Sequence, residues 1–373
     1  MLAMPIPGRT AAAFLAIALA ACSASPASAQ IELVDVGRFN FTGGGSADPR
    51  LIAEELSGLV RLTGNRYASI GDDHATLHFL DIEVDPQTGR VRSVTFGQPV
   101  PLLDPEGRPL PERAAGADRE DVAYDPVRGT VWIADERDSG DPSRPSLVEV
   151  DPETGREIDR IVPDSGGPLS VYDSIRPNYG FESLARDEDG ESMWTANEEA
   201  LTMDGPLASP STGTTVRIQE IDEEGRPARQ VAYVTDETTY PIEFPPGAVG
   251  EDRSGFSALL QLDEDRLLVL ERGLVGSASG LAEFRIRIYL ADVEDATDVS
   301  AEAFRTGLAG RTDWEPARKT LLFERRFGLP VSNFEGMAFG PRLDNGERSV
   351  LLIADNGGGS WQSIYALRLR GDP

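Results

Sequence analysis

The sequence is poor in the residues that many enzymes use for cross-links and for nucleophilic catalysis. It has one cysteine, Cys22, and two histidines, His74 and His78. One cysteine cannot form an intramolecular disulfide, and a catalytic serine usually needs a histidine base beside it. The pattern Gly-x-Ser-x-Gly is also missing, because the nearest match, residues 276–280, has alanine at its centre. We therefore expect neither a disulfide framework nor a Ser-His-Asp triad.

Positive charge is scarce as well. The chain has 35 lysine and arginine residues against 63 aspartates and glutamates, which gives a formal net charge of −28, and Lys319 is its one lysine. So negative a protein is repelled by phosphate backbones and anionic lipids, which argues against nucleic acid or an anionic membrane as the partner. The charge fits cation binding or simple solubility outside the cytoplasm.

Long apolar runs are missing outside the first 29 residues. Arg9 precedes the apolar run 11–21, which is too short to span a bilayer, and residues 27–29 read Ala-Ser-Ala. This is the pattern of an export signal. Residues 19–22 read Leu-Ala-Ala-Cys, which resembles the lipobox of bacterial lipoproteins. We expect residues 1–29 to be a signal peptide and the protein to be exported to the periplasm, to the outer membrane through a lipid on Cys22, or to the medium.

A hairpin unit recurs along the rest of the chain. In its last copy, Glu335 opens one apolar run, Asp344-Asn345-Gly346 provides strong turn chemistry, and Asp355 closes a second run. Four earlier copies share this plan, with 14 or 15 residues between the opening and the closing position, as from Glu120 to Asp135. The other opening residues are Ser57, Glu182 and Ser257, and the other closing residues are Asp72, Asn197 and Glu271. A unit repeated at a fixed period indicates a repeat architecture.

A third and a fourth strand are expected after most of these hairpins. The last unit lacks a fourth strand, and the N-terminal run 31–39 lacks a unit. We therefore predict an all-β fold, a β-propeller of four-stranded blades closed by the N-terminal strand pairing beside residues 363–369. The spacing of the units favours five blades and leaves six open. Residues 30–373 would form this single domain.

The acids that open and close the units should meet at one end of the propeller. In an antiparallel hairpin, the start of the first strand and the end of the second lie side by side. Carboxylate and amide oxygens suit Ca²⁺ or Mg²⁺, and we favour Ca²⁺; the alternative is that these side chains cap turns. The predicted metal ligands are Glu120, Asp135, Glu182, Asn197, Glu335 and Asp355.

Three phrases carry a family resemblance. They are GFESLAR with MWTANEEAL, REDVAYD with VWIADE, and NFEGMAF with LLIADN. Together they resemble the phytase-like domain family, which is described by the esterase-like activity of phytase. The resemblance spans roughly residues 31–369 and implies an exported bacterial propeller that binds metal and hydrolyses esters.

We therefore expect a metal-dependent hydrolase of phosphate or carboxylic esters, monomeric, acting on a small molecule. A cation at the channel mouth would activate water or polarise the ester. The expected catalytic residues are Glu182, Glu335 and Arg272, whose guanidinium suits a phosphate group. Two alternatives remain: a non-catalytic propeller that binds a partner, and a calcium-dependent lactonase-like hydrolase.

Overall fold

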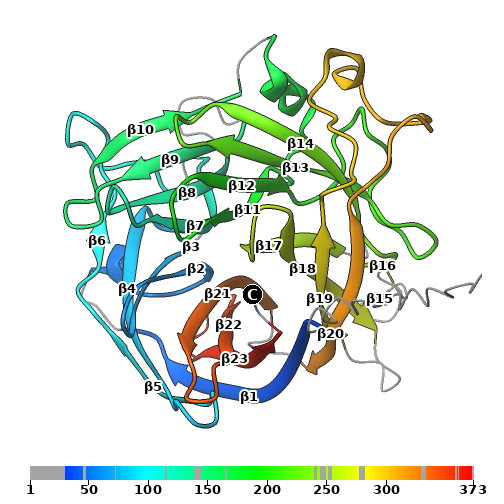
Figure 1. The fold of residues 1–373 in the computed structure, drawn as a ribbon. Coiled ribbons are helices and arrows are strands. Elements are labelled where there is room, and N and C mark those ends of the chain that lie inside the picture. The colour runs from blue at the N-terminus through cyan, green and yellow to red at the C-terminus, as the bar shows by residue number, and fades with distance from the viewer. Residues whose placement is uncertain are drawn as a thin grey trace, which may run out of the picture.

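A computed structural model of the protein describes residues 30–44, 48–71, 73–113, 116–137, 144–163, 166–238, 242–243, 249–250, 254–276, 282–328, 333–357, 359 and 361–371. Within these residues, five sheets of four strands each stand around a common axis (Figure 1). The predicted β-propeller with five blades is confirmed. The predicted signal peptide, Cys22 and Asp72 lie outside the described residues.

Each blade runs from an inner strand at the axis to an outer strand at the rim. Blade 1 contains β2 (Leu56–Thr63), β3 (Arg66–Gly71), β4 (Thr76–Val84) and β5 (Val91–Phe96), with the short β6 (Val100–Pro101) also paired to β4. Blade 2 contains β7 (Asp118–Asp125), β8 (Thr130–Arg137), β9 (Ser146–Val150) and β10 (Glu157–Ile161). Blade 3 contains β11 (Phe181–Arg186), β12 (Ser192–Asn197), β13 (Thr215–Asp222) and β14 (Pro227–Val234). Blade 4 contains β17 (Ser254–Gln261), β18 (Arg266–Gly276), β19 (Ala282–Asp292) and β20 (Arg318–Gly328).

Blade 5 joins the two ends of the chain. It contains β21 (Asn333–Arg342), β22 (Arg348–Asp355), β23 (Trp361–Arg370) and β1 (Glu32–Thr42). In Figure 1 the blue β1 lies beside the dark red β23, and their antiparallel register sets Leu33 opposite Leu369. The predicted closure by the N-terminal strand is therefore confirmed, and β1 covers the edge of β23 that would otherwise be open to another strand.

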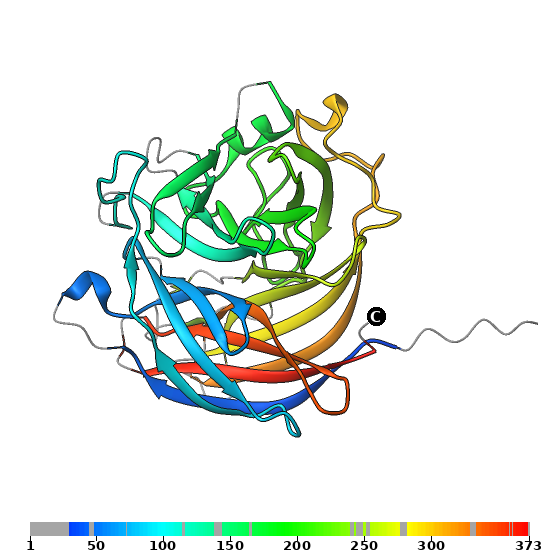
Figure 2. The same cartoon turned by 60° about the vertical axis from the view of Figure 1, so that its left-hand side comes forward.

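Few elements lie outside the blades. They are a two-stranded ribbon, β15 (Ile242–Glu243) with β16 (Val249–Gly250), and the 3-10 turns η1 (Pro49–Leu51), η3 (Pro168–Ser174) and η4 (Glu302–Phe304). Figure 2 shows the longer strands of blades 4 and 5 curving along one side of the molecule. Among the described residues, no helix has the length and apolar character needed to cross a membrane.

The hydrophobic core is divided among the spaces between neighbouring blades. β22 illustrates why its sequence is continuously apolar: Leu352 packs in the cluster shared with blade 4, whereas Leu351 packs in the cluster shared with blade 1. Successive side chains of a strand point to opposite faces, and here both faces are buried. Three further clusters fill the other spaces between blades. Each blade is thus stabilised by both neighbours, which holds the inner strands at fixed positions around the axis.

Candidate functional site at the acidic mouth of the channel

Each inner strand carries a β-bulge near its start, and the extra residue of this bulge is one of the opening residues of the repeat. In blade 3, Phe181 and Ser183 pair with successive residues of β12, so Glu182 between them has no partner in the ladder. The same shift leaves out Ser57, Glu120, Ser257 and Glu335 in the other blades. A bulge bends a strand and turns a side chain in a new direction. The bulge residues therefore occupy equivalent places at one end of the channel, here called the acidic mouth.

A second set of side chains reaches the acidic mouth from the ends of the second strands. In the observed register, Glu136, Glu198, Arg272 and Asp355 each follow the residue paired to the start of the bulge. At the ends of the second strands of blades 2 and 3, a glycine of the next blade makes room for the acid. A Cβ on Gly255, for example, would lie 2.5 Å from Cγ of Glu198.

Arg272 is the cation at the centre of this arrangement. Its Nε donates to Ser257 Oγ at 3.1 Å, and its Nη1 donates to Asn333 Oδ1 at 3.0 Å. Nη1 also lies 2.8 Å from Glu335 Oε1. Nη2 lies 3.0 Å from Glu198 Oε1 and 3.5 Å from Glu182 Oε1.

The guanidinium thus donates hydrogen bonds to Ser257, Asn333 and Glu198 and lies within ion-pair distance of Glu182 and Glu335. Burial disfavours its charge, but Glu335, Glu198 and Glu182 prevail and raise the pKa of Arg272 above its usual value. Arg272 therefore holds three blades together through their acids and orients the carboxylates.

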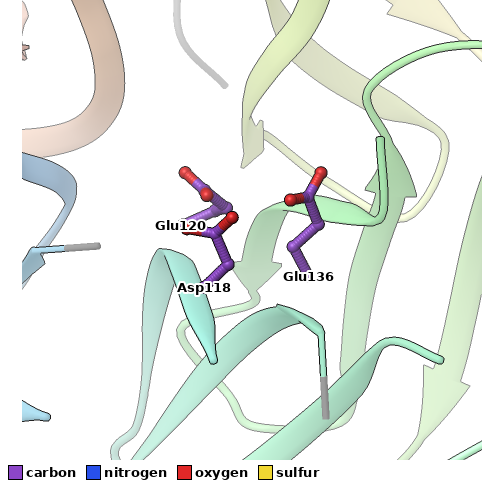
Figure 3. Close-up of side chains that lie close together, drawn as sticks. All are labelled: Asp118, Glu120 and Glu136. Carbon is purple, nitrogen blue, oxygen red and sulfur yellow. The ribbon is translucent and has the colours of Figure 1, made fainter. Parts of the chain in front are cut away.

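The acids continue as an arc into blade 2. Figure 3 shows the carboxyl groups of Asp118, Glu120 and Glu136 directed to the same side, the first two from β7 and the third from β8. One oxygen from each of these three lies within 4.8 Å of the others, and the same holds for Glu136, Glu182 and Glu198. Glu136 belongs to both groups, so the carboxyl groups form one connected set across blades 2 and 3.

Guanidinium groups lie beside several of these acids. Arg137 pairs with Asp118, and Arg113 Nη1 lies 3.1 Å from the same carboxylate. Arg137 Nε is 4.0 Å from Glu136 Oε2, whose other oxygen accepts the Gly180 amide at 2.7 Å. Among the described residues, Arg113, Arg137 and Arg272 thus lie at ion-pair distance from acids of the mouth.

The surplus of acids raises proton affinity at the mouth. Burial, followed by the charges of Glu198 and Glu136, raises the pKa of Glu182 well above its usual value, against the opposing effect of Arg272. Burial and then Asp118 and Glu198 raise the pKa of Glu136 in the same direction. Buried carboxyl groups that repel one another either keep a proton or accept a cation. Both metal-sized groups of acids are therefore capable of binding a metal.

The structure brings the predicted opening residues together at the mouth. It gives the predicted closing residues of the second strands mainly structural contacts. Asp135 accepts the Asp118 amide at 3.1 Å. Asn197 is fully buried, and its amide bonds the Glu199 carbonyl at 2.5 Å and the Arg217 amide at 3.0 Å.

Asp355 lies closer to the mouth than those two. In the observed register it stands one position later than Asp135 and Asn197, level with Arg272. It accepts Asn333 Nδ2 at 3.0 Å and the Gly357 amide at 2.7 Å. Its charge also contributes to the raised pKa of Arg272.

Three acids of the arc are missing from the predicted ligand set. The sequence does place Glu136 and Glu198 at the same edge, because each directly follows a predicted closing residue in the phrases Ala-Asp-Glu and Ala-Asn-Glu. Asp118 carries no repeat signal, and its place depends on how β7 begins. His74 belongs to neither metal-sized group, and its Nδ1 lies 3.8 Å from Glu112, whereas burial lowers the pKa of His78 to about 4.

Comparison with solved structures finds propellers of distant sequence. The chain is similar to an α-L-arabinofuranosidase from Podospora anserina in complex with cellotriose, with 11% identity, a TM-score of 0.42 and coverage of 90% of this chain and 97% of that one. It is similar to a thermostable family-43 glycoside hydrolase, with 9% identity, a TM-score of 0.43 and coverage of 85% and 93%. A third is the PQQ-bound aldose sugar dehydrogenase of Streptomyces coelicolor, with 12% identity, a TM-score of 0.33 and coverage of 93% and 100%. No curated protein matches this sequence.

A family model matches the chain itself over residues 53–358. This range begins just before the first inner strand, includes every bulge residue and ends just after β22. The chain belongs to the phytase-like family, whose description is the esterase-like activity of phytase.

Proposed function

We propose that this protein is a hydrolase of phosphate or carboxylic esters, and that it acts at the acidic mouth with a bound divalent cation, Ca²⁺ in the first instance. The observation that supports this is the connected arc of buried carboxyl groups beside Arg272. The family's description names an esterase-like activity, and the arc is the described part of the protein where such chemistry has suitable groups.

The acids fit a hard cation. Glu136, Glu182 and Glu198 each offer an oxygen within 4.8 Å of the other two, and all three are carboxylates, the ligands that Ca²⁺ and Mg²⁺ prefer. Burial and then repulsion from neighbouring acids raise the pKa values of Glu136 and Glu182, and a divalent charge would relieve the repulsion. When bound, such an ion supplies Lewis-acid polarisation of the ester or activation of water.

The protein's own side chains would then position the catalytic carboxylates and deprotonate the attacking water. The guanidinium of Arg272 is surrounded by acceptors of the protein itself. We therefore propose that it is a positioning residue that fixes Glu182 and Glu335 and does not contact substrate. Glu335, which belongs to neither metal-sized group, would accept the proton of the attacking water. Asn333 Nδ2 donates to Glu335 Oε1 at 2.8 Å and holds the carboxylate for that task.

The setting outside the cytoplasm is also a proposal. It is supported by the signal-like residues 1–29, with Cys22 as a lipid acceptor, and by the net charge of −28. We expect a monomer that acts on a small molecule, and a chain lacking residues 1–29 that folds as a soluble body, because β1 begins at Glu32.

Hydrolysis and thermal unfolding test the proposal together. Purified protein is assayed on p-nitrophenyl phosphate, p-nitrophenyl acetate and a simple lactone, each with Ca²⁺, with Mg²⁺ and with EDTA. We expect hydrolysis that EDTA abolishes and Ca²⁺ restores. Calcium at a hundredfold excess over its Kd should also stabilise the fold by about 3 kcal/mol.

Two variants separate the roles of the acids. Glu182→Gln should weaken calcium binding, whereas Glu335→Gln should retain calcium binding and lower kcat by about a hundredfold. Glu223→Gln, in the exposed turn after β13, is the matched control and should change neither. Stabilisation by calcium without hydrolysis of any substrate would favour a non-catalytic binding propeller, and no response to calcium or EDTA would refute the cation site.

A further inference from the structure

A second, quite different site lies at the other end of the channel. A cavity of about 390 Å³ is lined by the later halves of the inner strands. Its walls are apolar and come from every blade, through Leu59, Val122, Leu184, Leu260 and Met337. Sites for small ligands have this size and this mixture of apolar wall and few polar groups.

The lining of the cavity includes none of the acids of the mouth. At the level of the bulges, the inner strands approach one another so closely that added atoms would clash. A Cβ on Gly58 would lie 2.6 Å from Cα of Asp121, and one on Gly336 would lie 2.2 Å from the Ser57 carbonyl oxygen. Asp121 also accepts the Leu184 amide at 2.9 Å, which joins blades 2 and 3 at this level.

Three arginines border the cavity, and two of them have carboxylate partners. Arg186 Nη2 lies 2.8 Å from Asp125 Oδ2. Arg348 pairs with Glu188 and lies over the Phe339 ring, 3.7 Å from its centroid. These two guanidiniums are neutralised by the protein itself.

Arg61 differs from the other two. Its Nε donates to the Gly64 carbonyl at 2.8 Å, and its Nη1 donates to the Gly340 carbonyl at 3.3 Å. Within the described residues, its contacts are these backbone carbonyls, and no carboxylate stands at ion-pair distance from it. A guanidinium has five N–H groups, so Arg61 retains donors and an uncompensated charge at the edge of an apolar cavity.

We propose that this cavity binds a small molecule with an apolar body and one anionic group, a carboxylate, sulfonate or phosphate, which Arg61 holds at the rim. The apolar body would fill the space between the inner strands, and the anion would accept charge-assisted hydrogen bonds. Asp187, also on the rim, accepts the Ser192 amide at 3.2 Å and sits with Arg186 on blade 3, whereas Arg61 sits on blade 1. The proposal concerns the opposite end from the acidic mouth and does not depend on hydrolysis there.

A pair of fluorescent probes tests the two halves of this idea. 8-Anilino-1-naphthalenesulfonate has an apolar body and an anionic group, and N-phenyl-1-naphthylamine has the same body without the charge. The wild-type protein should bind the sulfonate at one saturable site and more tightly than the neutral probe. Since the net charge of −28 repels anions in general, such a preference would require a local cation.

Variants locate the binding. Arg61→Met keeps the apolar stem of the side chain and removes its charge. It should weaken sulfonate binding by about tenfold while leaving the affinity for the neutral probe unchanged. Leu260→Trp and, separately, Val60→Phe fill the cavity from blades 4 and 1 and should remove binding of both probes. Arg90→Met, an exposed arginine in the turn between β4 and β5, is the matched control.

The outcomes are distinct. Circular dichroism and thermal melting identify any variant that does not fold, and either cavity-filling variant is sufficient alone. Equal affinity of the wild type for both probes, with no effect of Arg61→Met, would overturn the role of the anion. Full binding in a folded cavity-filling variant would show that the probes sit elsewhere and would overturn the site.

Discussion

Replacing Arg272 by methionine tests whether charge holds the acidic mouth together. The guanidinium lies within 3.5 Å of oxygens from Glu182, Glu198 and Glu335 and is itself buried. Methionine keeps much of the apolar stem but leaves these carboxylates without their shared cation. Removing one partner of a buried ion pair costs about 3–5 kcal/mol, because the remaining charge is uncompensated.

The expected change in melting temperature follows from the size of the domain. Unfolding entropy of about 2.1 cal/mol/K per residue, over roughly 340 residues, gives about 0.7 kcal/mol/K. A loss of 3–5 kcal/mol therefore lowers Tm by about 4–7 °C at pH 7.5. Without Arg272, the pKa of Glu182, already raised in the native protein, rises further. More of Glu182 is then protonated at pH 5 than at pH 7.5, so the loss should be smaller at pH 5.

Thermal melting at the two pH values, monitored by circular dichroism, is the assay. Adding Glu182→Gln to Arg272→Met should recover part of the lost stability, because one of the unpaired charges is removed. Arg226→Met, which removes an exposed arginine paired with Asp222 in a turn, is the control and should leave Tm unchanged. An equal loss at pH 5 and pH 7.5, or no loss at either, would refute the electrostatic argument.

Three further predictions concern other parts of the fold. Burial raises the pKa of Glu199 from 4.5 to about 7, so between these pH values the native state binds more protons than the unfolded chain. The free energy of unfolding should therefore fall by about 3 kcal/mol as pH rises through this range. Urea titrations of Glu199→Gln should lack this pH-dependent loss of stability. Asp121→Ala leaves the amides of Leu59, Val122 and Leu184 without their acceptor, and should lower the free energy of unfolding by about 3 kcal/mol or more in the same measurement. Deleting residues 30–42 removes β1 and uncovers β23, so size-exclusion chromatography should show self-association, and a monomer with unchanged Tm would count against closure by β1.

The propeller could be predicted from the sequence because its signals are local and repeated. Each hairpin is indicated by an apolar run, a turn and a second apolar run, and the residues Asp344-Asn345-Gly346 strongly favour a hairpin turn. Closure followed from counting strands: the last unit had one too few, and residues 31–39 had no unit. The observed pairing of Leu33 with Leu369 supplies the strand that the last unit lacks.

The contacts within the mouth were less accessible. The pattern predicted that Glu120, Glu182 and Glu335 would lie at the axis, but not that a bulge would take each out of its ladder. A bulge changes the register by one residue, and a repeat alignment does not reveal on which strand the extra residue lies. In blade 5 this shift moves Asp355 level with Arg272.

The central place of Arg272 was equally hidden. Its partners Glu182 and Glu335 lie far from it in sequence and on two other blades. Only the closed ring brings these positions within 3.5 Å of one guanidinium. Local patterns specify each blade, whereas this contact depends on all of them being in place.

The five bulges also distinguish the positions that build the sheets from the positions whose side chains can vary. A residue outside the ladder contributes no paired strand position, so exchanging its side chain leaves the sheet's hydrogen bonds intact. Ser57 and Ser257 already stand where the other blades carry glutamate, on the same backbone. The channel mouth is therefore a set of interchangeable positions on a fixed frame, and a designer could rewrite its charge, metal preference or nucleophile one blade at a time without redesigning the propeller.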